Sequence, residues 1–223
     1  MRPVELAIFD CDGVLVDSEV IANRVFCEML NEIGLRVSLS DMFERFVGLS
    51  IPQCVELITE LNGRPPPPTF VTELQKRTAT VLSRQIKPIA GVTDALETLD
   101  IPCCVASSGT HEKINLTLGA TGLLQYFEDR IFSVADVENP KPAPDVFLFA
   151  ARTLGADPLA CVVIEDTPVG IRAAVAAGMR AIGFAASTPA KRLWEAGASE
   201  VISEMRQLPK ILQTAATALE VKQ

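Results

Sequence analysis

Two aspartates lie directly after the first apolar segment of the chain. Residues 4–9 form a largely apolar run, and Asp10, Asp12 and Gly13 follow it. Such a run is typical of a strand buried on both faces, and the carboxyl end of such a strand faces the ligand crevice of an α/β sheet. Two neighbouring carboxylates repel each other unless a cation or a proton lies between them. The pair suits half of a metal-assisted phosphate site, although Asp-x-Asp-Gly is an equally good turn sequence.

Further polar side chains follow later apolar segments or lie in a restricted loop, where they do not suit a hydrophobic core. They are Ser107, Ser108, Lys141, Glu165 and Asp166. The serines and the acids follow predicted strands, whose carboxyl ends share one edge of a parallel sheet. Prolines on both sides of the lysine restrict its backbone, which favours contact with a fixed anion. Each feature alone has a plainer interpretation as a capping loop, a helix N-cap or a surface lysine. Together, and in this order, they indicate a phosphate site.

The predicted site carries more negative than positive charge. Four carboxylates, those of Asp10, Asp12, Glu165 and Asp166, outnumber the one lysine, Lys141. Such a cluster needs a cation, and carboxylate oxygens without histidine or cysteine partners select Mg²⁺. Bound Mg²⁺ would also attract a phosphate to an acidic protein. The sequence therefore predicts Mg²⁺ as the cofactor.

The order of elements predicts two domains. Short apolar segments that alternate with helical patterns predict a parallel sheet with right-handed crossovers. Residues 16–88 interrupt this alternation, because their periodicity predicts four helices and no strand. The simplest account is an α/β fold: a Rossmann-like parallel-sheet core of residues 1–15 and 89–223 with an inserted all-helical cap of residues 16–88. The two crossings between these parts could act as a hinge.

Composition narrows the class of protein. A chain that is 48% hydrophobic and 22% charged fits a soluble globular protein. The net charge of −8 argues against a nucleic-acid or membrane-surface binder. No apolar stretch is long enough to span a bilayer, and no secretory signal is visible before the first strand. The six cysteines form no C-x-x-C pair, and one histidine leaves no zinc pattern. We therefore expect buried free thiols in a reducing cytoplasm.

These motifs resemble those of the haloacid dehalogenase (HAD) superfamily, in the branch that includes β-phosphoglucomutase and sugar-phosphate phosphatases. The resemblance rests on residues 10–19, 105–109, 141–145 and 164–167 and covers nearly the whole chain. It implies an enzyme, a phosphoric monoester hydrolase that acts on a small sugar phosphate through a phosphoaspartate intermediate. Within the branch, the chain looks somewhat closer to 6-phosphogluconate phosphatase-like members.

The resemblance also implies a role for each candidate residue. Asp10 would be the nucleophile, and Asp12 would be the general acid for the leaving oxygen and then the base for the hydrolytic water. The residues that would hold the phosphoryl oxygens are Ser107, Ser108 and Lys141. The ligands of Mg²⁺ would be Asp10, the main-chain carbonyl of Asp12, and Asp166, with support from Glu165.

Two alternatives stay open. One is a β-phosphoglucomutase-type phosphosugar mutase, but this chain has Ala22 where those mutases carry a histidine on the first cap helix. Ile51 also follows Gly48-Leu49-Ser50, where those mutases carry an arginine. Both differences favour simple hydrolysis. The other alternative is a catalytically idle phosphate-binding regulator, which has no need of the acid–base residue that the aspartate pair supplies.

Substrate choice falls to the predicted cap. Lys76 and Arg77, in its fourth helix, are candidate contacts for a substrate carboxylate or phosphate, although a solvated helix face explains either residue alone. The only histidine, His111, follows the second strand and is expected to be exposed or to cap a helix. We expect the partner to be a small phosphorylated metabolite, with no nucleic acid and no membrane, and the protein to be a monomer or weak dimer.

Overall fold

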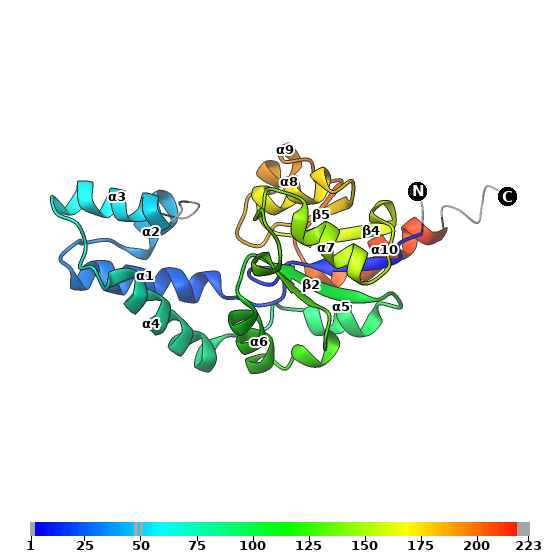
Figure 1. Cartoon of the computed structure of the whole chain (residues 1–223), viewed down its shortest axis with the longest axis horizontal. Coiled ribbons are helices and arrows are strands. Elements are labelled where there is room, and N and C mark those ends of the chain that lie inside the picture. Colours follow the sequence, from blue (N-terminus) through cyan, green and yellow to red (C-terminus); the bar gives the residue numbers. More distant parts are fainter. Residues whose placement is uncertain (1–2, 47–48, 50, 218–223) are drawn as a thin grey trace. The chain divides into compact units, whose positions relative to one another are not determined.

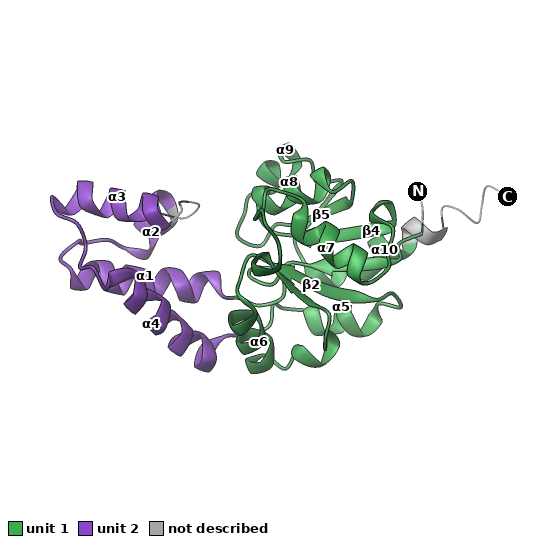
Figure 2. Cartoon of the chain, viewed as in Figure 1, with its two compact units in different colours: residues 1–17, 87–223 green, residues 18–86 purple. Residues whose placement is uncertain are grey.

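The computed structural model describes residues 3–46, 49 and 51–217, and the chain divides into two compact units (Figure 1; Figure 2). Unit 1 consists of Met1–Asp17 and Lys87–Gln223, and unit 2 consists of Ser18–Ile86. Unit 2 is therefore inserted into unit 1 after the first strand. The α/β fold class predicted from the sequence is confirmed, because unit 1 contains a parallel sheet with flanking helices. The role of unit 2 as a cap stays a prediction.

The described part of unit 1 contains a six-stranded parallel sheet with the order β3-β2-β1-β4-β5-β6. The strands are β1 (Leu6–Phe9), β2 (Cys103–Ser107), β3 (Ile131–Ser133), β4 (Cys161–Glu165), β5 (Arg180–Phe184) and β6 (Glu200–Ile202). Strand β1 lies between β2 and β4, so that Ile8 is paired with Cys104 on one side and with Val163 on the other. The polar residues after β1, β2 and β4 therefore come together at one edge of the sheet.

Burial explains the apolar runs in the sequence. Every residue of β1, β2 and β4 is buried, as expected for parallel strands covered on both faces. The helices of unit 1 are α5 (Val92–Thr98), α6 (His111–Ala120), α7 (Asp145–Thr153), α8 (Pro168–Ala176), α9 (Ala190–Glu195) and α10 (Leu208–Thr217). Helices α7 and α8 pack on the sheet through Phe147 and Ile171, which share a core cluster with Ile8 and Val163. This core holds the end of β1 rigidly.

Two threonine caps fix the helices that begin beside the strand ends. The Thr110 hydroxyl accepts a hydrogen bond from the Lys113 amide at 3.3 Å, at the start of α6. The Thr167 hydroxyl accepts one from the Gly170 amide at 3.0 Å, and Pro168 is the first residue of α8. The first turns of α6 and α8 are therefore anchored next to β2 and β4.

Unit 2 contains only helices within its described residues. They are α1 (Glu19–Glu32), α2 (Leu39–Arg45), α3 (Ile51–Asn62) and α4 (Phe70–Gln85). Its core includes the Phe26 ring, which packs edge-on against Phe46 at 5.5 Å and at a tilt against Phe70 at 6.0 Å between ring centroids. Gly48 and Ser50, which the sequence comparison with mutases used, lie outside the described residues. Across the described helices, none has the length and apolar character to cross a membrane.

Candidate active site

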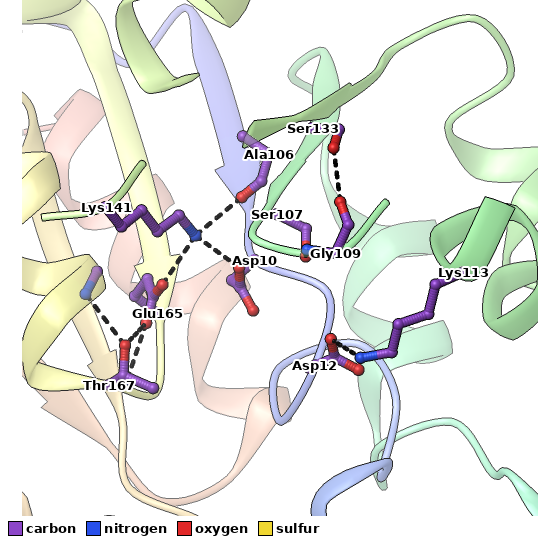
Figure 3. A network of polar contacts seen from close by, with 11 residues as sticks. Asp10, Asp12, Ala106, Ser107, Gly109, Lys113, Ser133, Lys141, Glu165 and Thr167 are labelled. Atoms are coloured by element: carbon purple, nitrogen blue, oxygen red, sulfur yellow. Dashed lines mark hydrogen bonds and ion pairs between the residues drawn. The ribbon is translucent and has the colours of Figure 1, made fainter. Parts of the chain in front are cut away.

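Asp10 lies immediately after β1, and its buried carboxylate contacts Lys141 (Figure 3). The Lys141 ammonium group donates to Asp10 Oδ1 at 2.6 Å, to Glu165 Oε1 at 3.0 Å and to the Ala106 carbonyl at 3.1 Å. The Lys141 side chain is 4% exposed and that of Glu165 is 2% exposed. The buried Lys141 ammonium group therefore joins two other sequence motifs, through Asp10 and Glu165, to the main chain of β2.

Burial and charge together set the ionisation of this group. Burial raises the pKa of Asp10, Lys141 lowers it, and the nearby Glu165 carboxylate raises it again, so the pKa lies at about 7. Burial alone would lower the pKa of Lys141, but Asp10 and Glu165 outweigh it and raise the pKa above its ordinary value. Lys141 therefore stays protonated at neutral pH. A cation beside Asp10 would favour the ionised carboxylate that a nucleophile requires.

Both carboxylate oxygens of Glu165 are engaged by the protein. Oε1 accepts from Lys141, and Oε2 accepts from the amide and the hydroxyl of Thr167, each at 2.8 Å. A Cβ at Gly170 would lie 1.7 Å from Oε1, so this carboxylate occupies the space beside a glycine of α8. The geometry therefore favours Glu165 as the residue that positions Lys141, more than as a metal ligand.

The Asp166 carboxylate lies against the loop that carries the two aspartates. A Cβ at Gly13 would lie 2.2 Å from Asp166 Oδ2, and Gly13 has φ of +78°, a conformation that favours glycine. Among the described residues, no three His, Cys, Asp or Glu side chains are grouped so that they could hold a metal ion. The carboxylates of Asp10 and Asp166 and the main-chain carbonyl of Asp12 stay the predicted ligands, a set that contains fewer than three such side chains. These hard oxygen donors fit Mg²⁺.

Asp12 contacts a lysine that the sequence did not single out. The Lys113 ammonium group lies 2.6 Å from Asp12 Oδ2 and comes from the first turn of α6. Although burial would lower the pKa of Lys113, Asp12 outweighs it and raises this pKa. The sequence contains one signal for this residue, since Lys113 is three positions after the capping Thr110 and thus belongs to a turn anchored beside β2.

The two serines after β2 differ in exposure. Ser107 is buried and accepts a hydrogen bond from the Gly109 amide at 3.1 Å, whereas Ser108 is exposed. The Ser133 hydroxyl donates to the Gly109 carbonyl at 2.6 Å, which holds this loop against β3. The His111 side chain is 44% exposed, and its Nε2 lies 2.9 Å from Asp136 Oδ1. The loop after β2 is therefore held in place next to Asp10.

Sequence comparison identifies the family. Residues 7–184 match the family of haloacid dehalogenase-like hydrolases. The chain belongs to this family. The resemblance inferred from the motifs is thereby confirmed, and so is the branch, because the relatives include sugar-phosphate phosphatases. One relative is the 6-phosphogluconate phosphatase of Escherichia coli K12, which is 28% identical over 95% of this chain and 96% of its own length.

Two solved structures resemble this HAD hydrolase over almost its whole length. A haloacid dehalogenase-like protein of unknown function from Agrobacterium tumefaciens has a TM-score of 0.87 and 39% identity, and the match covers 96% of this chain and 99% of that one. A HAD family hydrolase from Deinococcus radiodurans, crystallised with bound phosphate and sodium, has a TM-score of 0.86 and 30% identity, over 97% of this chain and 98% of that one.

The two predicted substrate contacts of the HAD hydrolase lie in unit 2. Lys76 and Arg77 both line a groove of about 280 Å³ that α1 and α4 form within this unit. Arg77 lies 2.7 Å from a carboxylate oxygen of Glu32 and 3.1 Å from one of Glu73, so two neighbouring acids match its charge. Within the described residues Lys76 makes no ion pair. Lys76 is therefore the better candidate for contact with a substrate anion.

Proposed function

We propose that this HAD hydrolase is a Mg²⁺-dependent phosphomonoesterase that acts on a small sugar phosphate through a phosphoaspartate intermediate on Asp10. The observation that carries the proposal is the buried network of Asp10, Lys141 and Glu165 at the carboxyl end of β1. A carboxylate next to a protonated lysine suits a nucleophile for a phosphoryl group. The phosphate bound in the Deinococcus radiodurans relative adds support.

The residues of this chain divide the reaction between them. Asp10 attacks phosphorus, and the Lys141 ammonium group compensates the charge of the phosphoryl oxygens. The Ser107 hydroxyl and the loop with Ser108 provide further contacts for these oxygens. Asp12 donates a proton to the leaving oxygen and then removes one from the water that hydrolyses the phosphoaspartate. Hydrolysis regenerates the Asp10 carboxylate and releases inorganic phosphate.

Three oxygen donors of this chain would hold the metal ion: the carboxylates of Asp10 and Asp166 and the main-chain carbonyl of Asp12. When bound, Mg²⁺ supplies positive charge that orients the phosphate and offsets its negative charge. Glu165 does not need to touch the ion in this scheme. Its two oxygens hold Lys141 and the Thr167 cap, which keeps the ammonium group aimed at Asp10.

Separate observations support the proposed substrate class and the proposed compartment. The relative named for 6-phosphogluconate favours a small sugar phosphate, and Lys76 is our candidate for a second anionic group of the substrate. All six cysteines are free, as predicted, and five of them are buried. Free thiols are typical of a reducing compartment, which favours the cytoplasm.

A phosphate-release screen tests the proposal. Wild-type enzyme, the Asp10→Asn variant and an exposed control variant, Asp100→Asn, are assayed on a panel of sugar phosphates with Mg²⁺ and with EDTA. We expect Mg²⁺-dependent release by the wild type and the control, and loss of release by Asp10→Asn. Normal turnover by Asp10→Asn would contradict the mechanism.

Two further measurements separate the alternatives. Incubation with β-glucose 1-phosphate and a bisphosphate activator that gave isomerised product without free phosphate would favour a mutase. The Ala22 position of α1 argues against this result, because the mutase histidine is missing there. Binding of Mg²⁺ and phosphate without turnover of any ester would favour the regulator.

A further inference from the structure

We propose that Lys113 is a positioning residue for Asp12, a role that rests on the proposed phosphatase function. The Lys113 ammonium group lies 2.6 Å from Asp12 Oδ2, as close as Lys141 lies to Asp10. In Figure 3 the two lysines reach the aspartates from opposite sides of the loop after β1. Each of the two reacting carboxylates is thus paired with its own lysine, from a different segment of unit 1.

Helix α6 is fixed against the aspartate loop at more than one point. Thr117 lies one turn after Lys113, on the same face of the helix, and its hydroxyl contacts the Cys11 thiol at 3.7 Å. Both residues that contact the loop are therefore four positions apart, which is the spacing of neighbours on one helix face. The Thr110 cap holds the first turn of the same helix. The backbone of Lys113 has a defined position relative to Asp12.

The stem of Lys113 packs against the loop after β2. A Cβ at Gly109 would lie 3.6 Å from Lys113 Cδ, so the aliphatic part of the side chain passes over the loop after β2. The charged end then reaches Asp12. A charge-assisted hydrogen bond of this length restricts the carboxylate to a narrow range of orientations. Without it, the Asp12 side chain would sample several rotamers, of which few would face the leaving oxygen.

Exposure distinguishes this pair from the buried one. The side chains of Lys113 and Asp12 are 41% and 27% exposed, whereas those of Lys141 and Asp10 are 4% and 9% exposed. A partly exposed ion pair contributes little to folding stability. Removal of Lys113 should therefore leave the fold intact and act on the orientation of Asp12. This separation makes the role of Lys113 testable by kinetics.

The test compares Lys113→Met, which keeps an aliphatic stem, with Lys113→Arg, which keeps the charge. Lys191→Met is the control, because Lys191 is an exposed lysine of the same unit in a weak ion pair with Glu195. We expect Lys113→Met to lower kcat by about tenfold or more, with little change in KM. This loss is part of the rate enhancement that a correctly oriented general acid–base supplies. Lys113→Arg should restore most of the rate, and the control should match the wild type. If Lys113→Met does not fold, Lys113→Gln takes its place.

A double-mutant cycle shows whether Lys113 acts through Asp12. The cycle uses p-nitrophenyl phosphate, whose weakly basic leaving group keeps Asp12→Asn measurable. Because residues that act as a unit are not additive, adding Lys113→Met to Asp12→Asn should cost little further rate. A fully multiplicative loss, a change in KM alone, or an unchanged kcat would overturn the proposal.

The outcomes also separate this inference from the proposed function. If the wild type released phosphate from no ester, the proposed function itself would fail. If the wild type were active, Asp10→Asn were inactive and Lys113→Met were normal, only the role of Lys113 would fail.

Discussion

The substitution Gly170→Ala tests the buried network without changing any charged residue. An alanine Cβ at this position would lie 1.7 Å from Glu165 Oε1 and 1.9 Å from Glu165 Cδ. Real Cβ atoms essentially never approach other atoms within 3.0 Å, so the carboxylate must leave its place. It would then lose its hydrogen bonds to Lys141 at 3.0 Å and to the amide and hydroxyl of Thr167, both at 2.8 Å.

The three lost hydrogen bonds set the size of the effect. Hydrogen bonds to a charged group contribute about 1.5 kcal/mol each at the lower end of their range. Alanine has a higher helix propensity than glycine, which raises the free energy of unfolding by about 1 kcal/mol. We therefore expect Gly170→Ala to lower the free energy of unfolding by about 3.5 kcal/mol, or Tm by roughly 7–14 °C for a chain of this size. Turnover should fall as well, because Lys141 loses one of its two carboxylate partners.

Gly119→Ala is the matched control, since it makes the same change in a helix of the same unit. Gly119 lies in α6, and a Cβ there would have nothing within 4 Å. This variant should be more stable than the wild type by roughly 0.5–1 kcal/mol. Thermal unfolding and phosphate release are measured for both variants. A Gly170→Ala enzyme as stable and as active as Gly119→Ala would refute the reasoning.

Three further predictions address the metal site, the buried charges and pH. Gly13→Ala should raise the Mg²⁺ concentration needed for half-maximal turnover, because its Cβ would lie 2.2 Å from Asp166 Oδ2; a Mg²⁺ titration that matches the wild type would count against this. Lys141→Met should destabilise the fold by about 3–5 kcal/mol, since two buried carboxylates lose their counter-charge, and adding Glu165→Gln should recover part of the loss. Chemical denaturation measures both variants, and the absence of any recovery would argue against the network. In EDTA, burial raises the pKa of Asp10 from 3.8 to about 7, so its contribution to stability is full below about pH 4 and is lost as pH rises through 7. Relative to Asp10→Asn, the wild type should lose stability over this window, and parallel pH profiles would exclude the effect.

Much of the fold could be predicted because the relevant signals are local. The apolar run of β1 ends directly before Asp10. A continuous apolar run of this kind is the typical sequence pattern of a parallel strand that is buried on both faces. The caps at Thr110 and Thr167 depend on residues only three positions apart, which a sequence displays directly. Parallel pairing then brings the strand ends together by topology alone. Asp10, Lys141 and Glu165 therefore meet at the carboxyl ends of these strands.

The contacts between motifs could not be predicted in the same way. Lys113 and Asp12 are 101 positions apart, and their contact depends on the rotation of α6, whose Thr117 also contacts Cys11. The sequence also suggested an anion for Lys141 but could not tell a bound phosphate from the protein's own carboxylates. Three-dimensional packing supplies the protein's own anions, because Lys141 is buried among Asp10 and Glu165. Side-chain orientation is the information that a strand and helix pattern lacks.

The most direct test of the central claim is the stereochemical course of hydrolysis at phosphorus. A phosphorothioate ester made chiral at phosphorus with two oxygen isotopes is hydrolysed by the wild-type enzyme with Mg²⁺ in water of the third isotope, and the configuration of the released inorganic thiophosphate is determined. Attack by Asp10 followed by attack of water inverts phosphorus twice. The account therefore predicts net retention of configuration, and net inversion would contradict it by showing a direct attack of water.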